Sequence, residues 1–272
     1  MGLPTVRARP SVEPWPPLLV VHGPGFWGKF HSHHSLHFVL AMDGELLVRS
    51  STSGPWSRAA GVLTAPDAPH AIDCHGVEVV LVFLDPQSEA GATLHAALTP
   101  AVRRLSGAER SALLRDVVPR TSRRSGAAEW VRTAARTLQL PLAPARRAIH
   151  PSVRKLVGLL HASGVDEETS LEKLARAVGL SPSRLMHVFT SSMGIPLRPY
   201  LSWLRVQRAA GAIVNGDSLT EAAHAAGFSD AAHMSRTFRR MLGTRPSELR
   251  RFTCSPWGAR QVQGPKDDAS DG

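Results

Sequence analysis

The sequence predicts an α+β protein of two domains, an N-terminal β-barrel followed by an all-α C-terminal domain. Its 272 residues are enough for two independent hydrophobic cores. From Leu18 to Asp85, short apolar or alternating runs are separated by Gly, Pro and Asp, as in a small barrel or sandwich. Residues 170–200 and 218–247 repeat one order of cap, small residue, glycine and phenylalanine about 50 positions apart, which predicts a duplicated pair of helices.

The composition is that of a globular protein, with 43% hydrophobic and 20% charged residues. No apolar run approaches the length that crosses a membrane, and no hydrophobic segment follows the first basic residues as it would in a secretory signal. Cys74 and Cys254 are too few for a disulfide framework. We therefore expect a cytoplasmic protein with reduced thiols and no membrane partner.

The formal net charge of +10 is unevenly distributed along the chain. Residues 1–100 contain 5 Lys and Arg against 8 Asp and Glu, whereas residues 101–251 contain 25 against 11. A basic second half beside an acidic first half indicates a polyanion-binding module attached to another domain. Basic charge alone would also fit RNA or a membrane surface, and the duplicated helix pair favours duplex DNA.

The β-like region follows a proline-rich stretch, residues 1–17, which should form an extended arm. Within the β-like region, Asp43 and Gly44 separate two apolar runs and predict a β-hairpin. The segment HSHHSLH places His31, His33 and His37 at even spacing, so on one strand they would share a face and His34 would take the other.

Together with His70, His31, His33 and His37 would form a metal site suited to Zn²⁺, Ni²⁺ or Fe²⁺. The alternative is a barrel that keeps these histidines for packing or for hydrogen bonds to a ligand. No cofactor is therefore certain. A ligand pocket in the barrel would also be lined by Trp27 and Phe38.

Helical patterns replace the strands after the barrel. Ser106 and Glu109 form a capping-box pattern that predicts a helix, and a second helical stretch follows the loop predicted at residues 120–126. Residues 141–151 should be a proline-rich linker. The predicted domains are residues 1–95 for the barrel, 96–150 for the helical connector and linker, 151–252 for the DNA-binding domain, and 253–272 for a disordered tail.

The most informative stretch is SLTEAAHAAGFSDAAHMSRTFRRMLGTRPS, residues 218–247. Ser218 and Glu221 form a capping box, so a helix should begin at Leu219. Gly227 should end it at a tight turn, and Ser229 or Asp230 should cap a second helix with a basic outer face. Two short helices around a glycine turn are the plan of a DNA-binding helix-turn-helix.

The first copy of this plan uses Ser170, Gly179, Ser181 and Gly194 at the equivalent points. A helix over residues 196–215 should connect the two copies and span about 30 Å. This is close to the roughly 34 Å between successive major-groove faces of B-DNA. One chain could therefore place two recognition helices in adjacent turns of the groove.

Residues 152–251 resemble the paired helix-turn-helix domain of the AraC/XylS family of bacterial transcription regulators, most specifically in GFSDAAHMSRTFRRMLGTRPSELR. The spacing from Gly25 through the histidines to Gly44 resembles the first cupin motif, with His37 where many cupins carry Glu. GVLTAPDAPH, residues 61–70, resembles a shortened second cupin motif. A cupin-like barrel ahead of the paired helix-turn-helix is also what the AraC/XylS resemblance implies.

The resemblance and the helix patterns together assign two sets of DNA contacts. Arg236 is the best candidate for a direct base contact, because a guanidinium can bind guanine O6 and N7 with two hydrogen bonds. The expected base-contact residues are Ser183, Arg184, Met186, His187, Ala231, Ala232, His233, Ser235 and Arg236. The expected phosphate contacts, which set affinity rather than sequence preference, are Arg198, Arg205, Arg239, Arg240, Arg245 and Arg250.

The sequence thus predicts a sequence-specific transcriptional regulator, not an enzyme, controlled by a small molecule or metal in its barrel. The alternative is a metal-dependent cupin enzyme, an oxygenase or isomerase, with a fused DNA-binding module. The resemblance implies double-stranded DNA and RNA polymerase as partners of an activator, although the residues themselves leave activation and repression open. They also leave open whether the chain forms a homodimer.

Overall fold

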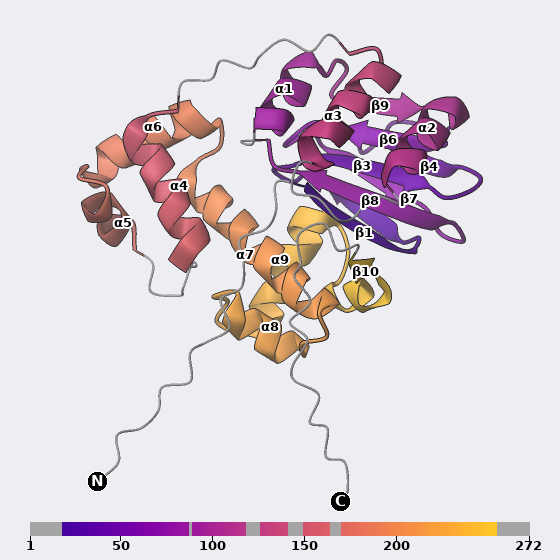
Figure 1. The fold of residues 1–272 in the computed structure, drawn as a ribbon. Coiled ribbons are helices and arrows are strands. Elements are labelled where there is room, and N and C mark those ends of the chain that lie inside the picture. The colour runs from indigo at the N-terminus through magenta and orange to yellow at the C-terminus, as the bar shows by residue number, and fades with distance from the viewer. Residues whose placement is uncertain (1–17, 87–88, 118–125, 141–148, 164–169, 255–272) are drawn as a thin grey trace, which may run out of the picture.

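A computed structural model of the protein describes residues 18–86, 89–117, 126–140, 149–163 and 170–254. The described chain forms a β half, capped by three helices, and a helical half that lies against it (Figure 1). The arm predicted at residues 1–17, nearly all of the predicted loop, most of the predicted linker, and the predicted tail from residue 255 lie outside these residues.

Two antiparallel sheets form the β half, which confirms the predicted α+β arrangement of short strands followed by helices. The larger sheet has the order β10-β1-β8-β3-β6-β9 and the smaller one β2-β7-β4-β5. The strands are β1 Leu18–Pro24, β2 Trp27–His31, β3 Leu36–Ala41, β4 Leu46–Arg49, β5 Ser57–Ala59, β6 Gly61–Thr64, β7 His70–Asp73, β8 Glu78–Leu84, β9 Val102–Leu105 and β10 Thr253–Cys254.

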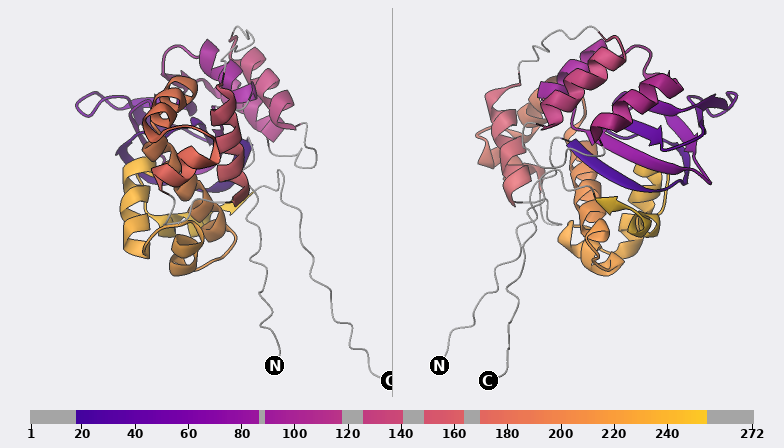
Figure 2. Two further views of the ribbon diagram at one scale, coloured as in Figure 1. Left: turned by 90° about the vertical axis from the view of Figure 1, so that its left-hand side faces the viewer. Right: turned by 45° about the vertical axis from the view of Figure 1, so that its right-hand side comes forward.

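Both faces of the larger sheet are buried. Alternate side chains of its strands point to opposite sides, so the sheet contributes to two separate cores. Val39 and Leu81 join a core with residues of the smaller sheet, such as Ile72. On the other face, Phe38 packs edge-to-face on Trp130, with ring centroids 4.9 Å apart. That face is covered by α1 (Glu89–Ala97), α2 (Gly107–Val117) and α3 (Gly126–Thr137) (Figures 1 and 2).

The hairpin predicted at Asp43 and Gly44 is wrong. Gly44 does adopt a positive φ of 66°, as a tight turn requires. The strands on either side of the turn do not pair with each other, however, because β3 pairs with β6 and β8, whereas β4 pairs with β5 and β7. The turn carries the chain from one sheet to the other, and a local turn signal does not distinguish these outcomes.

The β half also extends beyond its predicted boundary at residue 95. Strand β9 lies in the segment predicted as a helical connector and pairs with β6. Strand β10 lies in the predicted disordered tail and pairs with β1, with Val21 opposite Cys254. The β half is therefore completed by a segment that follows the helical half in the sequence.

The helical half contains two cores that share one long helix. Its elements are α4 Pro151–Ser163, α5 Leu171–Ala177, α6 Pro182–Met193, α7 Leu197–Val214, α8 Leu219–Ala225, α9 Ala231–Leu242 and the 3-10 helix η1 Pro246–Arg251. The first part of α7 contributes Tyr200 and Leu204 to the core of α4–α6. The remainder contributes Val206 and Ile213 to the core of α8 and α9. The two units are thus fixed to one rigid element.

The predicted helix starts and turns are confirmed. Ser218 and Glu221 form a complete capping box at the start of α8, and Gly227 has a φ of 81°. In the other unit Ser170 and Ser181 cap α5 and α6. Of the described helices, none combines the length and the hydrophobicity needed to cross a membrane.

Candidate DNA-reading helices and a buried histidine cluster

Helix α6 presents the predicted base-contact residues of the first unit to solvent. Its N-terminal cap is Ser181, whose hydroxyl accepts a hydrogen bond from the Arg184 backbone N–H at 3.3 Å. Leu185 and Phe189 are buried and fix which side faces the core. The four predicted contacts are all exposed, namely Ser183, Arg184, Met186 and His187. With Met186 48% exposed, this apolar side chain lacks the burial expected of a core residue.

Helix α9 exposes fewer of its predicted base-contact residues than α6 does. Asp230, one of the two predicted caps, accepts a hydrogen bond from the His233 backbone N–H at 2.6 Å. Ala232 and Arg236 are exposed, whereas Ala231, His233 and Ser235 are half-buried. The His233 ring lies 3.1 Å from the Ser229 hydroxyl. Arg236 is thus the predicted base contact on this helix with the longest freely accessible side chain.

The arginines predicted to contact phosphates are mostly accessible. Arg205, in the middle of α7, is the exception because it is half-buried. The other five are exposed, namely Arg198, Arg239, Arg240, Arg245 and Arg250. Their charges can therefore reach a polyanion without a change in the fold.

The histidines form a buried cluster, although not along one strand as predicted. His31 ends β2, His33 and His34 lie in the connection, and His37 belongs to β3 in the other sheet. His70, at the start of β7, completes the cluster from the strand next to β2. One ring nitrogen each of His31, His33 and His70 lies within 4.8 Å of the other two. The chain reversal, rather than period-two alternation, brings them together.

Two of these rings are oriented by backbone carbonyl groups. The His31 Nδ1 lies 2.6 Å from the Lys29 carbonyl oxygen, and the His70 Nδ1 lies 2.8 Å from that of Ala68. A carbonyl oxygen can only accept, so Nδ1 carries the hydrogen in both rings and Nε2 keeps its lone pair. Metal-binding histidines are commonly held in this way.

Burial keeps these imidazoles uncharged. Loss of solvation, followed by the nearby His70, lowers the pKa of His31 to about 3. Burial also lowers the pKa values of His33, His37 and His70. All four rings are therefore neutral at neutral pH, which is the protonation state that binds a metal. The donor set fits Zn²⁺ or a similar ion.

His37 stands apart from the other three histidines. Its Nδ1 lies 3.2 Å from the His33 Nε2, and its ring stacks on Phe83 with centroids 4.1 Å apart. The nitrogen group compatible with one metal ion contains His31, His33 and His70 but not His37. The predicted set of four is therefore reduced to three, with His37 in contact with its edge.

The two aromatic residues predicted to line the effector pocket lie elsewhere, and Phe26, directly before β2, lines a pocket in the β half. Trp27 is 51% exposed and Phe38 packs under α3, so neither lines the interior of the β half. Phe26 takes the inward place instead, in an apolar pocket beside His31, His33 and His37. The helical half closes this pocket with Leu242, Thr244, Glu248, Leu249 and Phe252. No local sequence signal links these distant residues to the barrel.

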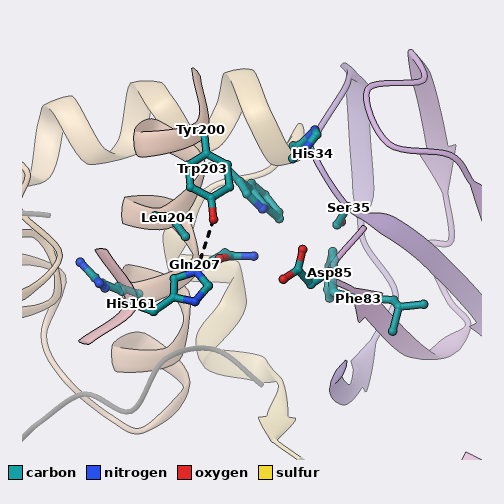
Figure 3. A pocket seen from close by; sticks show the side chains of 11 residues that line it. His34, Ser35, Phe83, Asp85, His161, Tyr200, Trp203, Leu204 and Gln207 are labelled. Carbon is teal, nitrogen blue, oxygen red and sulfur yellow. Dashed lines mark hydrogen bonds between the residues drawn. The ribbon is translucent and has the colours of Figure 1, made fainter. Parts of the chain in front are cut away.

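A second pocket lies between the two halves and is more polar (Figure 3). His34 and Asp85 reach it from the β half, and Tyr200 and Gln207 from α7. The Tyr200 hydroxyl lies 3.4 Å from the His161 Nε2 of α4. Sequence reasoning missed this pocket because α4 and α7 meet the barrel only in the tertiary structure.

Comparison with known proteins identifies the helical half. A family model described as a helix-turn-helix domain matches residues 174–251. The uncharacterized HTH-type transcriptional regulator YijO of Escherichia coli K12 is 31% identical over 114 residues, which are 42% of this chain and 39% of that protein. The arabinose operon regulatory protein of Escherichia coli K12 is 31% identical over 111 residues, 38% of this chain and 37% of that protein.

Solved structures extend the likeness to both halves. The crystal structure of ToxT from Vibrio cholerae O395 aligns with a TM-score of 0.54 and 9% identity, covering 85% of this chain and 95% of ToxT. An apo ToxT variant aligns with a TM-score of 0.57 and 11% identity, covering 88% and 99%. At these identities the likeness shows a shared fold.

The matches to the two curated relatives span about two fifths of those proteins, so the identification applies to the helical part. Within it, the duplicated helix pair, the capped recognition helices and the family match agree. This chain therefore carries a helix-turn-helix domain in residues 174–251, similar to the matching part of the arabinose operon regulatory protein, and it shares the overall fold of ToxT.

Proposed function

We propose that the protein binds duplex DNA sequence-specifically and regulates transcription. The observation that carries this proposal is the pair of capped helices, α6 and α9, whose outer residues are exposed and whose inner residues fix them to a shared helix. Helix α7 has 18 residues and so spans about 27 Å. Two recognition helices on such a spacer suit two successive major grooves on one side of the duplex.

The two recognition helices differ in what they can read. The outer face of α6 offers Ser183, Arg184 and His187, which can hydrogen-bond base edges. That of α9 offers Arg236 beside Ala232, whose methyl group suits thymine. The surrounding exposed arginines supply phosphate contacts. We therefore propose that α6 reads a mixed hydrogen-bonding pattern and α9 reads a guanine next to a thymine.

The β half is proposed to hold the effector. Its apolar pocket is lined by aromatic and aliphatic side chains and closed by the helical half, so a ligand there would touch both. One ToxT structure is bound to an unsaturated fatty acid and another to a naphthalenyl butenoic acid. A largely apolar small molecule suits this pocket, and the histidine cluster beside it offers a metal as the other effector.

The geometry favours regulation over the metal-dependent cupin enzyme. His31, His33 and His70 are 8%, 2% and 0% exposed, and the helical half covers them. A substrate would need the two halves to separate before it could reach a metal there. RNA polymerase and a second copy of the chain remain predicted partners, a cytoplasmic location remains a prediction, and activation and repression remain open.

The test is selection of binding sites from random duplex DNA, followed by gel shifts over a salt series. We expect a site with two conserved boxes about one helical turn apart and an affinity that falls steeply with salt. Metal analysis and turnover assays on the same preparation test the alternative, a metal-dependent cupin enzyme. If the selection recovers no preferred sequence and the protein turns over a substrate, the proposal that it is a transcriptional regulator would be contradicted.

A further inference from the structure

The histidine cluster lies directly beneath the DNA-binding half. Trp203 of α7 stacks on His33, with ring centroids 5.8 Å apart and ring planes at 20°. Gly243, the residue that ends α9, rests on β2 and accepts a hydrogen bond from the Lys29 backbone N–H at 3.1 Å. The cluster therefore touches both the helix that joins the two DNA-binding units and the end of the second recognition helix.

The contact at Gly243 leaves no room for a side chain. A Cβ there would lie 2.5 Å from the Lys29 carbonyl oxygen and 2.6 Å from the His31 Nδ1. Gly243 also has a φ of 67°, which residues with a side chain rarely adopt. The end of α9 thus packs against the Lys29 backbone and the ring of His31, a cluster residue, so a shift of His31 would move this contact.

Within the described residues, two buried ring nitrogens of the cluster have no hydrogen-bond partner, the Nε2 of His37 and the Nε2 of His70. Only His70 belongs to the group compatible with one metal ion, and its side chain is fully buried. Because Nδ1 of this ring donates to Ala68, Nε2 is an acceptor with an unused lone pair. A buried unpaired acceptor is costly, whereas a metal ion shared with His31 and His33 would satisfy it.

We propose that His31, His33 and His70 bind one divalent ion of the Zn²⁺ type, and that this ion controls how firmly the second helix-turn-helix unit is docked on the barrel. Three neutral imidazoles with an open fourth position are a known zinc arrangement. Metal binding would fix the His31 ring, which contacts Gly243, and the His33 ring, which stacks on Trp203. The inference rests on the proposed regulatory function and names its effector and its route to the recognition helix.

The first measurement is a titration of tag-free, chelator-treated full-length protein with Zn²⁺, and with Co²⁺ for its visible spectrum. We expect one ion per chain, and loss of this binding in His70→Ala and in His33→Gln. His75→Ala is the matched control, because His75 is exposed and pairs with Asp73 away from the cluster. Binding that survives both cluster variants, or no binding in the wild type, would overturn the site. Thermal unfolding verifies that each variant is folded.

The second measurement is amide hydrogen exchange with and without Zn²⁺, which needs no DNA. We expect Zn²⁺ to slow exchange about tenfold in β2 and in the last turn of α9, where the Lys29 amide meets Gly243. Gly243→Ala should still bind Zn²⁺ but lose this response, because its Cβ prevents the docked contact. Equal exchange in both states, with metal bound, would overturn the coupling.

Gel shifts on a selected DNA site then separate this inference from the proposed function. We expect DNA affinity to change about tenfold between chelator and Zn²⁺ in the wild type, and less than twofold in Gly243→Ala. No DNA binding in either state would reject the proposed function while leaving the metal and exchange results to decide the metal site and its docking role. DNA binding that ignores Zn²⁺ would reject metal control.

Discussion

At the scale of single residues, location on a recognition helix separates side chains that can choose a sequence from side chains that only add charge. Arg236 lies on the second turn of α9, and Arg240 lies one turn further toward the C-terminus. Both are exposed and carry the same charge. A difference between their variants would therefore reflect position on the DNA rather than electrostatics alone.

Arg236→Ala should reduce discrimination between the preferred site and single-base variants of it by about 1–3 kcal/mol, because a bidentate base contact is lost. Arg240→Ala should weaken binding to all sequences alike and reduce the salt slope by about 1, because one phosphate contact is lost. Gel shifts over a salt series measure both effects. Identical profiles for the two variants would mean that the reading face of α9 is assigned wrongly.

Cys74 shows how burial suppresses the chemistry of a side chain. Its thiol is 1% exposed, its Sγ lies 3.1 Å from the Phe26 carbonyl oxygen, and burial raises its pKa to about 11. In a Cys254→Ser variant, Cys74 should react with a disulfide reagent at pH 8 about a hundredfold or more slower when folded than in denaturant. The thiol stays protonated until the pH approaches 11. Equal rates would show that the site is open to solvent.

At the scale of elements, the helix ends were predictable because each depends on a few adjacent residues. The serine caps and the positive φ angles at Gly179, Gly194 and Gly227 follow from local backbone requirements. The pairing of β3 and β4 with different strands was not predictable, because it depends on which sheet each strand joins. Trp27 was misplaced for a different reason, because neighbouring residues of a strand point to opposite faces and the sequence did not show which face of β2 is inward.

Ser181→Ala should destabilise the first helix-turn-helix unit by about 1 kcal/mol, because the Arg184 backbone N–H loses its capping partner. Chemical denaturation gives the free energy of unfolding. Thr190→Ala, an exposed position on the same helix, provides the control and should change stability by less than about 0.5 kcal/mol. A cap variant as stable as this control would indicate that water replaces the serine hydroxyl.

At the scale of the whole molecule, the two halves are joined by a shared hydrophobic core and not only by the connecting chain. Phe252, which follows η1, is buried in the core of the β sandwich and meets Phe26 edge-to-face, with centroids 6.1 Å apart. Trp203 and Gly243 add contacts at the histidine cluster. The sequence indicated which residues formed each half, but contacts between segments about 200 positions apart carry no local pattern.

Phe252→Ala should therefore destabilise the β half, although the residue comes directly after η1 of the helical half in the chain. Truncation of a buried phenylalanine typically costs about 3–5 kcal/mol. Calorimetry or denaturant unfolding measures the loss of stability, and hydrogen exchange in β1 and β8 shows whether it affects the β half. Met42→Ala, at a partly exposed turn, is the comparison and should have little effect. A loss confined to α8 and α9 would show that the halves fold independently.

The pairing of β10 with β1 also bears on solubility. In the sheet order, β10 lies on the outer side of β1, where it pairs with Val21 and His22, and β1 has the largely apolar sequence LLVVHGP. If the helical half swings away or is removed, β1 becomes a free sheet edge with unpaired backbone groups, which invites pairing with another chain. Strand β10 therefore protects this edge of the β half from pairing with another chain, and any opening that releases β10 would leave the edge exposed.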